Sequence, residues 1–184
     1  GPVVYLKGNT GFKMSEMVYV GKERLVGEVI ALTKDTTTVQ VFEETTGLKP
    51  GETVTASGDA LSVTLGPGIL NNIFDGIERP LSEIAKQSGK YISRGLTVDS
   101  LDTEKKWDVH VTVSEGEELM GGAIIAEAQE TRSIVHKSMV PPDVNGTVIW
   151  AAKDGKYTIL DPIVKLKLED GTEKEITLAQ KWPI

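Results

Sequence analysis

Glycine, proline and Asx residues divide the first 65 residues into short apolar runs, and this spacing restricts the fold more than any other feature of the chain. The runs are rich in β-branched and other apolar side chains, which favour strands over helices. Strands this short at this spacing predict a small closed or nearly closed β-barrel over residues 1–65. The expected strands cover residues 3–6, 17–20, 25–32, 37–42 and 62–65.

The spacing of apolar residues changes in the middle segment, residues 66–106. A cluster of apolar residues after Pro67 favours one or two helical turns, and residues 81–88 predict a second short helix with Ile84 and Ala85 on one face. The segment has too few apolar residues for a core of its own, so it is expected to lean on other structure. Its first apolar side chains are expected to expose apolar surface or to pair between molecules. These are Ile69, Leu70, Ile73 and Phe74.

The last segment, residues 107–184, again has the pattern of strands. Valines alternate with His110 and Thr112, which predicts a half-buried strand. Three dipeptides of the kind favoured in hairpin turns follow, since both of their residues accept positive φ. The last one is expected to join residues 163–168 to residues 175–178. The dipeptides are Asn145-Gly146, Asp154-Gly155 and Asp170-Gly171.

Composition excludes several classes of function. A net charge of −7 without any basic run argues against a nucleic-acid-binding or anionic-membrane surface. The absence of cysteine excludes disulfides and thiolate metal sites. No apolar run is long enough for a membrane span, so direct membrane insertion is not expected.

Candidate chemical groups are sparse. No Gly-Lys pair has the preceding glycine and following hydroxyl residue of a phosphate-binding loop. His110 is expected to be a surface residue and His136 a structural one. Paired carboxylates lie beside expected turns, and the tryptophans are expected to pack rather than to stack on bases. We therefore assign no catalytic, cofactor-binding or metal-ligating residue, and a stand-alone enzyme that uses scattered carboxylates is the weakest alternative. The pairs are Glu43-Glu44, Glu117-Glu118 and Glu169-Asp170, and the tryptophans are Trp107, Trp150 and Trp182.

Residues 115–148 show a succession of an expected turn, a strand and an exposed loop, followed by the motif P-x-x-G-x-V. It resembles the barrel-sandwich hybrid of biotinyl and lipoyl carrier domains, in which a modified lysine lies on an exposed hairpin. Lys137 is the nearest candidate lysine, although it lies close to Pro141-Pro142 rather than at the centre of a turn. A carrier or small-molecule-binding module is therefore the alternative function, while fold alone does not establish it.

The order of residues from Val39 to Leu81 is too specific to be explained by composition alone. On this stretch and those given below, the chain resembles the catalytic A subunit of archaeal and bacterial V/A-type ATPases and ATP synthases. The resemblance extends over nearly all 184 residues in the order of the family. Ser138 departs from it, since a large aliphatic residue is usual there. Further matching stretches are Gly1-Pro2-Val3-Val4, residues 25–30, Arg94-Gly95, Leu101-Asp102, Lys106-Trp107, His136-Lys137, residues 140–142, residues 155–158 and residues 180–183.

This resemblance implies a division of labour along the chain. Residues 1–65 would form the N-terminal β-barrel that joins B subunits in a hexamer of alternating A and B subunits. Residues 66–106 would form a connector at the edge of the nucleotide-binding domain. Residues 107–184 would form the bulge, an A-subunit insertion that contacts E/G-type subunits of the peripheral stalk.

The same resemblance implies where the chemistry occurs. The parent enzyme would make or hydrolyse ATP, coupled to transport of H⁺ or Na⁺, on the cytoplasmic face of a membrane. Mg-ATP or Mg-ADP would bind in a nucleotide-binding domain that follows Ile184, and a short segment would precede Gly1. The chain itself is expected to need no cofactor and to serve assembly and docking.

Overall fold

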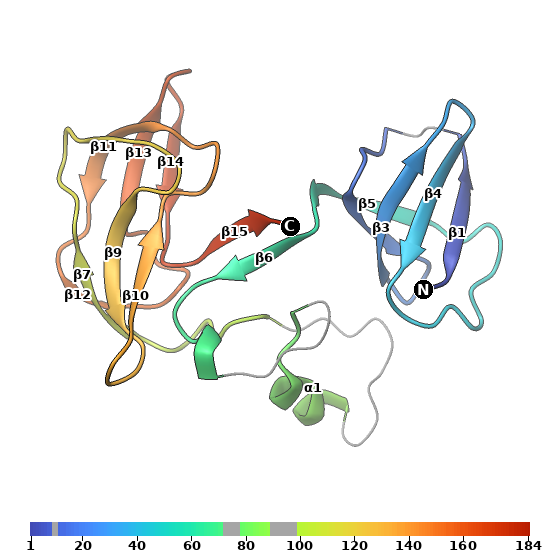
Figure 1. The fold of residues 1–184 in the computed structure, drawn as a ribbon, viewed down its shortest axis with the longest axis horizontal. Coiled ribbons are helices and arrows are strands. Elements are labelled where there is room, and N and C mark those ends of the chain that lie inside the picture. The colour runs from blue at the N-terminus through green and yellow to red at the C-terminus, as the bar shows by residue number, and fades with distance from the viewer. Residues whose placement is uncertain (9–10, 72–77, 89–98) are drawn as a thin grey trace. The chain divides into compact units, whose positions relative to one another are not determined.

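The computed structural model is mainly β, as the sequence predicts. It describes residues 1–8, 11–71, 78–88 and 99–184. The chain forms two compact units, and each is described by itself (Figure 1). The first unit contains Gly1–Ser62, the described part of Ile84–Thr97, and Pro183–Ile184. The second unit contains Val63–Glu83 and Val98–Trp182, apart from the residues outside the described ranges.

The first unit is built on a five-stranded antiparallel sheet with the order β1-β4-β3-β2-β5 (Figure 1). Buried and less buried side chains alternate along β2 and β4, so one face of the sheet lines a single apolar core. The strands are β1 (Val3–Lys7), β2 (Glu16–Val20), β3 (Leu25–Leu32), β4 (Thr36–Val41) and β5 (Val54–Ala60). The core side chains are Phe12, Val18, Val20, Leu25, Val29, Val39 and Val41.

Two glutamates fasten loops of the first unit. The carboxylate of Glu16 is buried, and it accepts hydrogen bonds from the backbone N–H groups of Lys13 (3.0 Å) and Gly58 (3.3 Å). Glu52 accepts a 2.7 Å hydrogen bond from the N–H of Lys49. The pKa of Glu52 is lowered, chiefly by the hydrogen bond from the backbone amide of Lys49 and then by that from Lys22. Both carboxylates therefore serve local structure.

Two sequence predictions for the first unit are wrong in detail. Strand β5 (VTASGDA) was not predicted, because most of its side chains are exposed and its composition is polar. Residues 62–65 do form a strand, β6 (Ser62–Leu65), but it pairs with β15 (Gln180–Pro183) in a separate two-stranded sheet. The apolar pattern of β6 identifies a strand, whereas its partner lies more than 100 residues away.

The second unit contains two four-stranded sheets, with the orders β10-β9-β7-β12 and β14-β13-β11-β8 (Figure 1). Their buried side chains form one cluster, which includes Ile125, Val148 and Leu166. The strands of the first sheet are β7 (Trp107–Val111), β9 (Ile124–Gln129), β10 (Val135–Met139) and β12 (Gly155–Tyr157). Those of the second are β8 (Glu118–Leu119), β11 (Gly146–Ala151), β13 (Val164–Leu168) and β14 (Glu173–Ile176).

Only one of the three predicted hairpin dipeptides forms a hairpin. Gly171 has φ 84° between β13 and β14, which pair antiparallel as predicted. Asn145-Gly146 instead leads into β11, and Asp154-Gly155 leads into β12, which pairs with β7 in the other sheet. Gly146 is required for a different reason. A Cβ there would lie 2.6 Å from the carbonyl oxygen of Lys167, so this glycine allows close approach of β13.

The described residues of the connector contain two short helices. A 3₁₀ helix, η1 (Ile69–Asn71), occupies the first predicted position, and α1 (Leu81–Ser88) has the predicted bounds. Ile84 is buried as predicted, but Ala85 is exposed. Ile69 packs against the core of the second unit, so its predicted exposure is wrong, whereas Leu70 is 53% exposed. The predictions for Ile73 and Phe74 lie outside the described residues.

Candidate functional site

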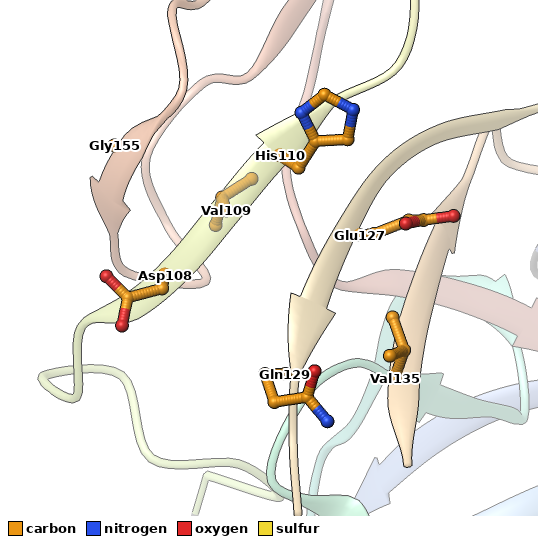
Figure 2. Close-up of a pocket in the computed structure, with 7 residues that line it drawn as sticks. All are labelled: Asp108, Val109, His110, Glu127, Gln129, Val135 and Gly155. Carbon is orange, nitrogen blue, oxygen red and sulfur yellow. The ribbon is translucent and has the colours of Figure 1, made fainter. Parts of the chain in front are cut away.

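The outer face of the sheet β10-β9-β7-β12 has a shallow groove of about 320 Å³. Figure 2 shows Asp108 and His110 along one strand, Glu127 and Gln129 on its neighbour, and Val135 on the next. Strand alternation brings these side chains together, because residues two apart on a strand share a face. Val109 and Gly155 complete the lining.

The antiparallel register arranges this face in rows. Lys137 on β10 lies opposite Glu127 on β9, and Glu127 lies opposite His110 on β7. In the neighbouring row Lys156 lies opposite Asp108, and their charged groups are 3.7 Å apart. Opposite charges thus neighbour one another across the strands, which favours the pairing.

His110 has a specific charged partner. Its Nδ1 lies 2.7 Å from Oδ2 of Asp154, while Oδ1 of Asp154 accepts a 2.8 Å hydrogen bond from the N–H of Val111. The hydrogen bond with Asp154 raises the pKa of His110 and lowers that of Asp154. His110 is a surface residue as predicted, with a side chain 65% exposed. Its partner was missed because Asp154 lies 44 residues away and the sequence predicts it to lie in a turn.

His136 faces the opposite side of the same sheet. Its pKa is lowered, chiefly by burial, with a smaller opposing effect from the charge of Glu130. Its Nε2 is buried without a hydrogen-bond partner in the described part of the chain. A half-buried imidazole with a buried Nε2 suits a packing group, the structural role predicted for it.

Lys137, the candidate carrier lysine, lies in the middle of β10 opposite Glu127. Carrier domains expose their modified lysine on a hairpin, and a lysine within a paired strand lacks that presentation. The structure therefore gives no support to Lys137 as a site of lipoylation or biotinylation.

The carboxylate pairs lie at turns and strand ends, where Glu117 and Asp170 cap backbone groups. Asp170 accepts hydrogen bonds from the N–H (2.9 Å) and hydroxyl (2.6 Å) of Thr172, which lower its pKa. Glu117 accepts a 3.0 Å hydrogen bond from the N–H of Ser114. Within the described ranges no group of three or more His, Asp and Glu side chains could hold a metal ion.

The tryptophans differ in their exposure. Trp107 is a core residue, 4% exposed, with the Lys105 ammonium 4.1 Å from its ring centroid. Trp150 is 38% exposed beside Lys165, and Trp182 lies in β15.

Among the described residues, no helix has the length and hydropathy that crossing a bilayer requires.

Two family models match the chain, one for each β unit. Residues 1–58 match the β-barrel domain of the ATP synthase alpha/beta family. Residues 98–184 match the barrel-sandwich domain of the ATP synthase alpha/beta subunit. The predicted combination of a barrel and a barrel-sandwich fold is thereby confirmed.

Curated relatives match along the entire chain. It is 50% identical over 184 residues to the A subunit of the A-type ATP synthase of Methanopyrus kandleri and 49% identical to the V-type ATP synthase alpha chain of Halothermothrix orenii. It is 46% identical to the A subunit of the A-type ATP synthase of Pyrococcus abyssi. All 184 residues align in each case, and they span 31%, 31% and 18% of these relatives. The chain therefore belongs to the ATP synthase alpha/beta family, of which it carries the β-barrel and barrel-sandwich domains.

Proposed function

We propose that this chain is the assembly and docking region of the catalytic A subunit of a rotary V/A-type ATP synthase. The whole protein would make or hydrolyse ATP in a nucleotide-binding domain outside this chain, coupled to H⁺ or Na⁺ transport. Identity of 46–50% over all 184 residues to the A subunits and alpha chains of such enzymes is the observation that supports this proposal most strongly. The complex would lie on the cytoplasmic face of its membrane.

Each unit would have its own partner. The β-barrel unit would join neighbouring B subunits in the hexamer, and the barrel-sandwich unit would dock E/G-type subunits of the peripheral stalk. The groove-bearing face of the sheet β10-β9-β7-β12 is our candidate for the docking contact. It offers alternating charges together with Val135 on the edge strand, which is 42% exposed, and interfaces commonly combine apolar with polar side chains.

Capture by the peripheral-stalk heterodimer of the source organism tests the docking role. The purified chain should be retained by the immobilised heterodimer, and the double variant Asp108→Lys/Glu127→Lys should lose retention. The matched control, Glu173→Lys/Glu175→Lys, reverses two charges on β14 of the other sheet and should still be retained. Equal retention of both variants would reject the groove-bearing face, while no retention of the parent chain would reject docking itself.

Calorimetric titration with Mg-ATP tests the expected location of the chemistry. The chain should release no binding heat, because none of its Gly-Lys pairs lies in a phosphate-binding loop pattern. Saturable binding at micromolar concentration would show that nucleotide recognition extends into this region.

A further inference from the structure

Glu130 joins the end of a strand to the first part of the connector, and both lie in the second unit. It follows β9 directly and is 9% exposed. Its Oε1 accepts hydrogen bonds from the backbone N–H groups of Gly68 (2.7 Å) and Leu70 (3.1 Å). These donors lie 62 and 60 residues away along the chain, at the start of η1. A strand end and a distant turn thus share one carboxylate.

The turn has few local means of satisfying these amides. The first N–H groups of a helix lack partners within the helix, and a nearby Ser, Thr, Asp or Asn usually accepts from them. Here the preceding residues are Gly66 and Pro67, whose side chains offer no acceptor. Glu130 supplies the acceptor from another part of the unit, so removing it would leave the two amides without their carboxylate partner.

The surrounding packing fits the turn closely to the barrel-sandwich unit. A Cβ on Gly66 would lie 2.8 Å from Leu101 and 2.9 Å from Ala179, and a Cβ on Gly68 would lie 3.3 Å from the ring of Trp107. Ile69 packs against the same core. The turn is therefore closely packed against the unit. The carboxylate of Glu130 adds hydrogen bonds, which fix the orientation of the turn in a way that apolar packing alone does not.

We infer that Glu130 is a latch, a positioning residue that holds residues 68–70 of the connector against the strands of the second unit, so that this part of the connector and the strands move as one body. The burial of its carboxylate is compensated by hydrogen bonds to two amides that belong to the connector. One consequence rests on the proposed function. Force applied by a docked stalk would be transmitted through Glu130 to residues 68–70. Without this contact, residues 68–70 could move independently of the strands.

Amide hydrogen exchange, followed by NMR on the ¹⁵N-labelled chain, tests the latch. In Glu130→Ala the amides of Gly68 and Leu70 should exchange at least about tenfold faster, since a hydrogen bond to a charged group is among the stronger ones. Amides of β7 and β9 should keep their protection. Glu127→Ala is the matched control, because Glu127 lies on β9, three residues before Glu130, with its side chain in the outer groove. It should leave both connector amides unchanged.

Glu130→Gln provides a second measurement that also applies if the alanine variant does not fold. Its neutral amide oxygen still accepts, but more weakly than a carboxylate. Exchange at Gly68 and Leu70 should therefore rise by less than in the alanine variant and remain above that of the parent chain. Parent-like exchange of both amides in Glu130→Ala, or in Glu130→Gln where only that variant folds, overturns the latch.

Capture by the stalk heterodimer separates the latch from docking. If the amides of Gly68 and Leu70 exchange faster in Glu130→Ala and the heterodimer still captures this variant, the latch is independent of the docking contact. Failure of the parent chain to bind the heterodimer would reject docking, while the exchange result would still decide the latch.

Discussion

The hydroxyl of Ser138 on β10 donates a 2.7 Å hydrogen bond to the backbone carbonyl of Leu178, and both residues are almost fully buried. Beside it, the N–H of Met139 donates to Oε1 of Gln180 (3.2 Å). Residues 178–180 thus bind along β10 through side chains as well as backbone. This arrangement explains how serine packs at a position where a large aliphatic residue is expected from the resemblance.

Replacing Ser138 by alanine should destabilise the chain. The carbonyl of Leu178 would remain buried without its donor, and an unsatisfied buried acceptor costs about 1–3 kcal/mol. Denaturant unfolding should show a decrease of this size in the free energy of unfolding. Ser133→Ala is the control, because Ser133 is exposed, and it should change stability by less than about 0.5 kcal/mol. Equal stability of the two variants would contradict the structural role of Ser138.

The contact between His110 and Asp154 should be visible in a histidine titration. Because Asp154 stabilises the protonated ring, the pKa of His110 should lie above the usual value, and Asp154→Asn should return it toward that of an exposed histidine. NMR of the ring protons measures both values. His136 is the internal reference in the same spectra, since burial holds its pKa below the usual value. An unchanged His110 pKa in the variant would show that the contact is absent in solution.

The two histidines should affect stability on opposite sides of about pH 6.5, the ordinary histidine pKa. The folded pKa of His136 is depressed, so the unfolded chain binds more protons and stability falls as the pH decreases below about 6.5. The folded pKa of His110 is raised, so its contribution is complete below about 6.5 and is lost as the pH rises through its folded pKa. His136→Gln should reduce the acid-side slope of stability against pH, and His110→Gln should reduce the alkaline-side slope. Unfolding curves from about pH 5 to 8 measure both slopes, and the opposite assignment would refute the two shifts.

Local patterns predicted most of the elements that are defined by local contacts. Strands β2 and β4 alternate regularly, α1 is bounded by turn residues, and Asp170-Gly171 closes a hairpin between adjacent strands. Strand β5 escaped prediction because it lies at the end of the sheet and exposes most of its side chains. A strand with little apolar surface has a weak periodic signal.

Contacts between distant residues were not predictable from local pattern. His110 and Asp154, Glu130 and Gly68, and Ser138 and Leu178 are each separated by 40 or more residues. A single sequence shows the side chains that can donate or accept, but the sheet register decides which of them meet. The resemblance to a family supplied the units, whereas the groove and the latch required the three-dimensional structure.

The two glycines that do not form hairpins allow the last prediction. Asn145-Gly146 and Asp154-Gly155 look alike in sequence, but only Gly146 lies against backbone. The Cβ of an alanine there would lie 2.6 Å from the carbonyl oxygen of Lys167, whereas a Cβ on Gly155 would meet only the Tyr157 ring at 3.5 Å. Gly146→Ala should force β11 away from β13 and cost about 1–3 kcal/mol, as overpacking usually does. Gly155→Ala should be tolerated within about 0.5 kcal/mol, since neither space nor a positive φ opposes it. Thermal unfolding of both variants measures the difference, and a Gly155 variant as unstable as the Gly146 variant would contradict the difference between their Cβ surroundings.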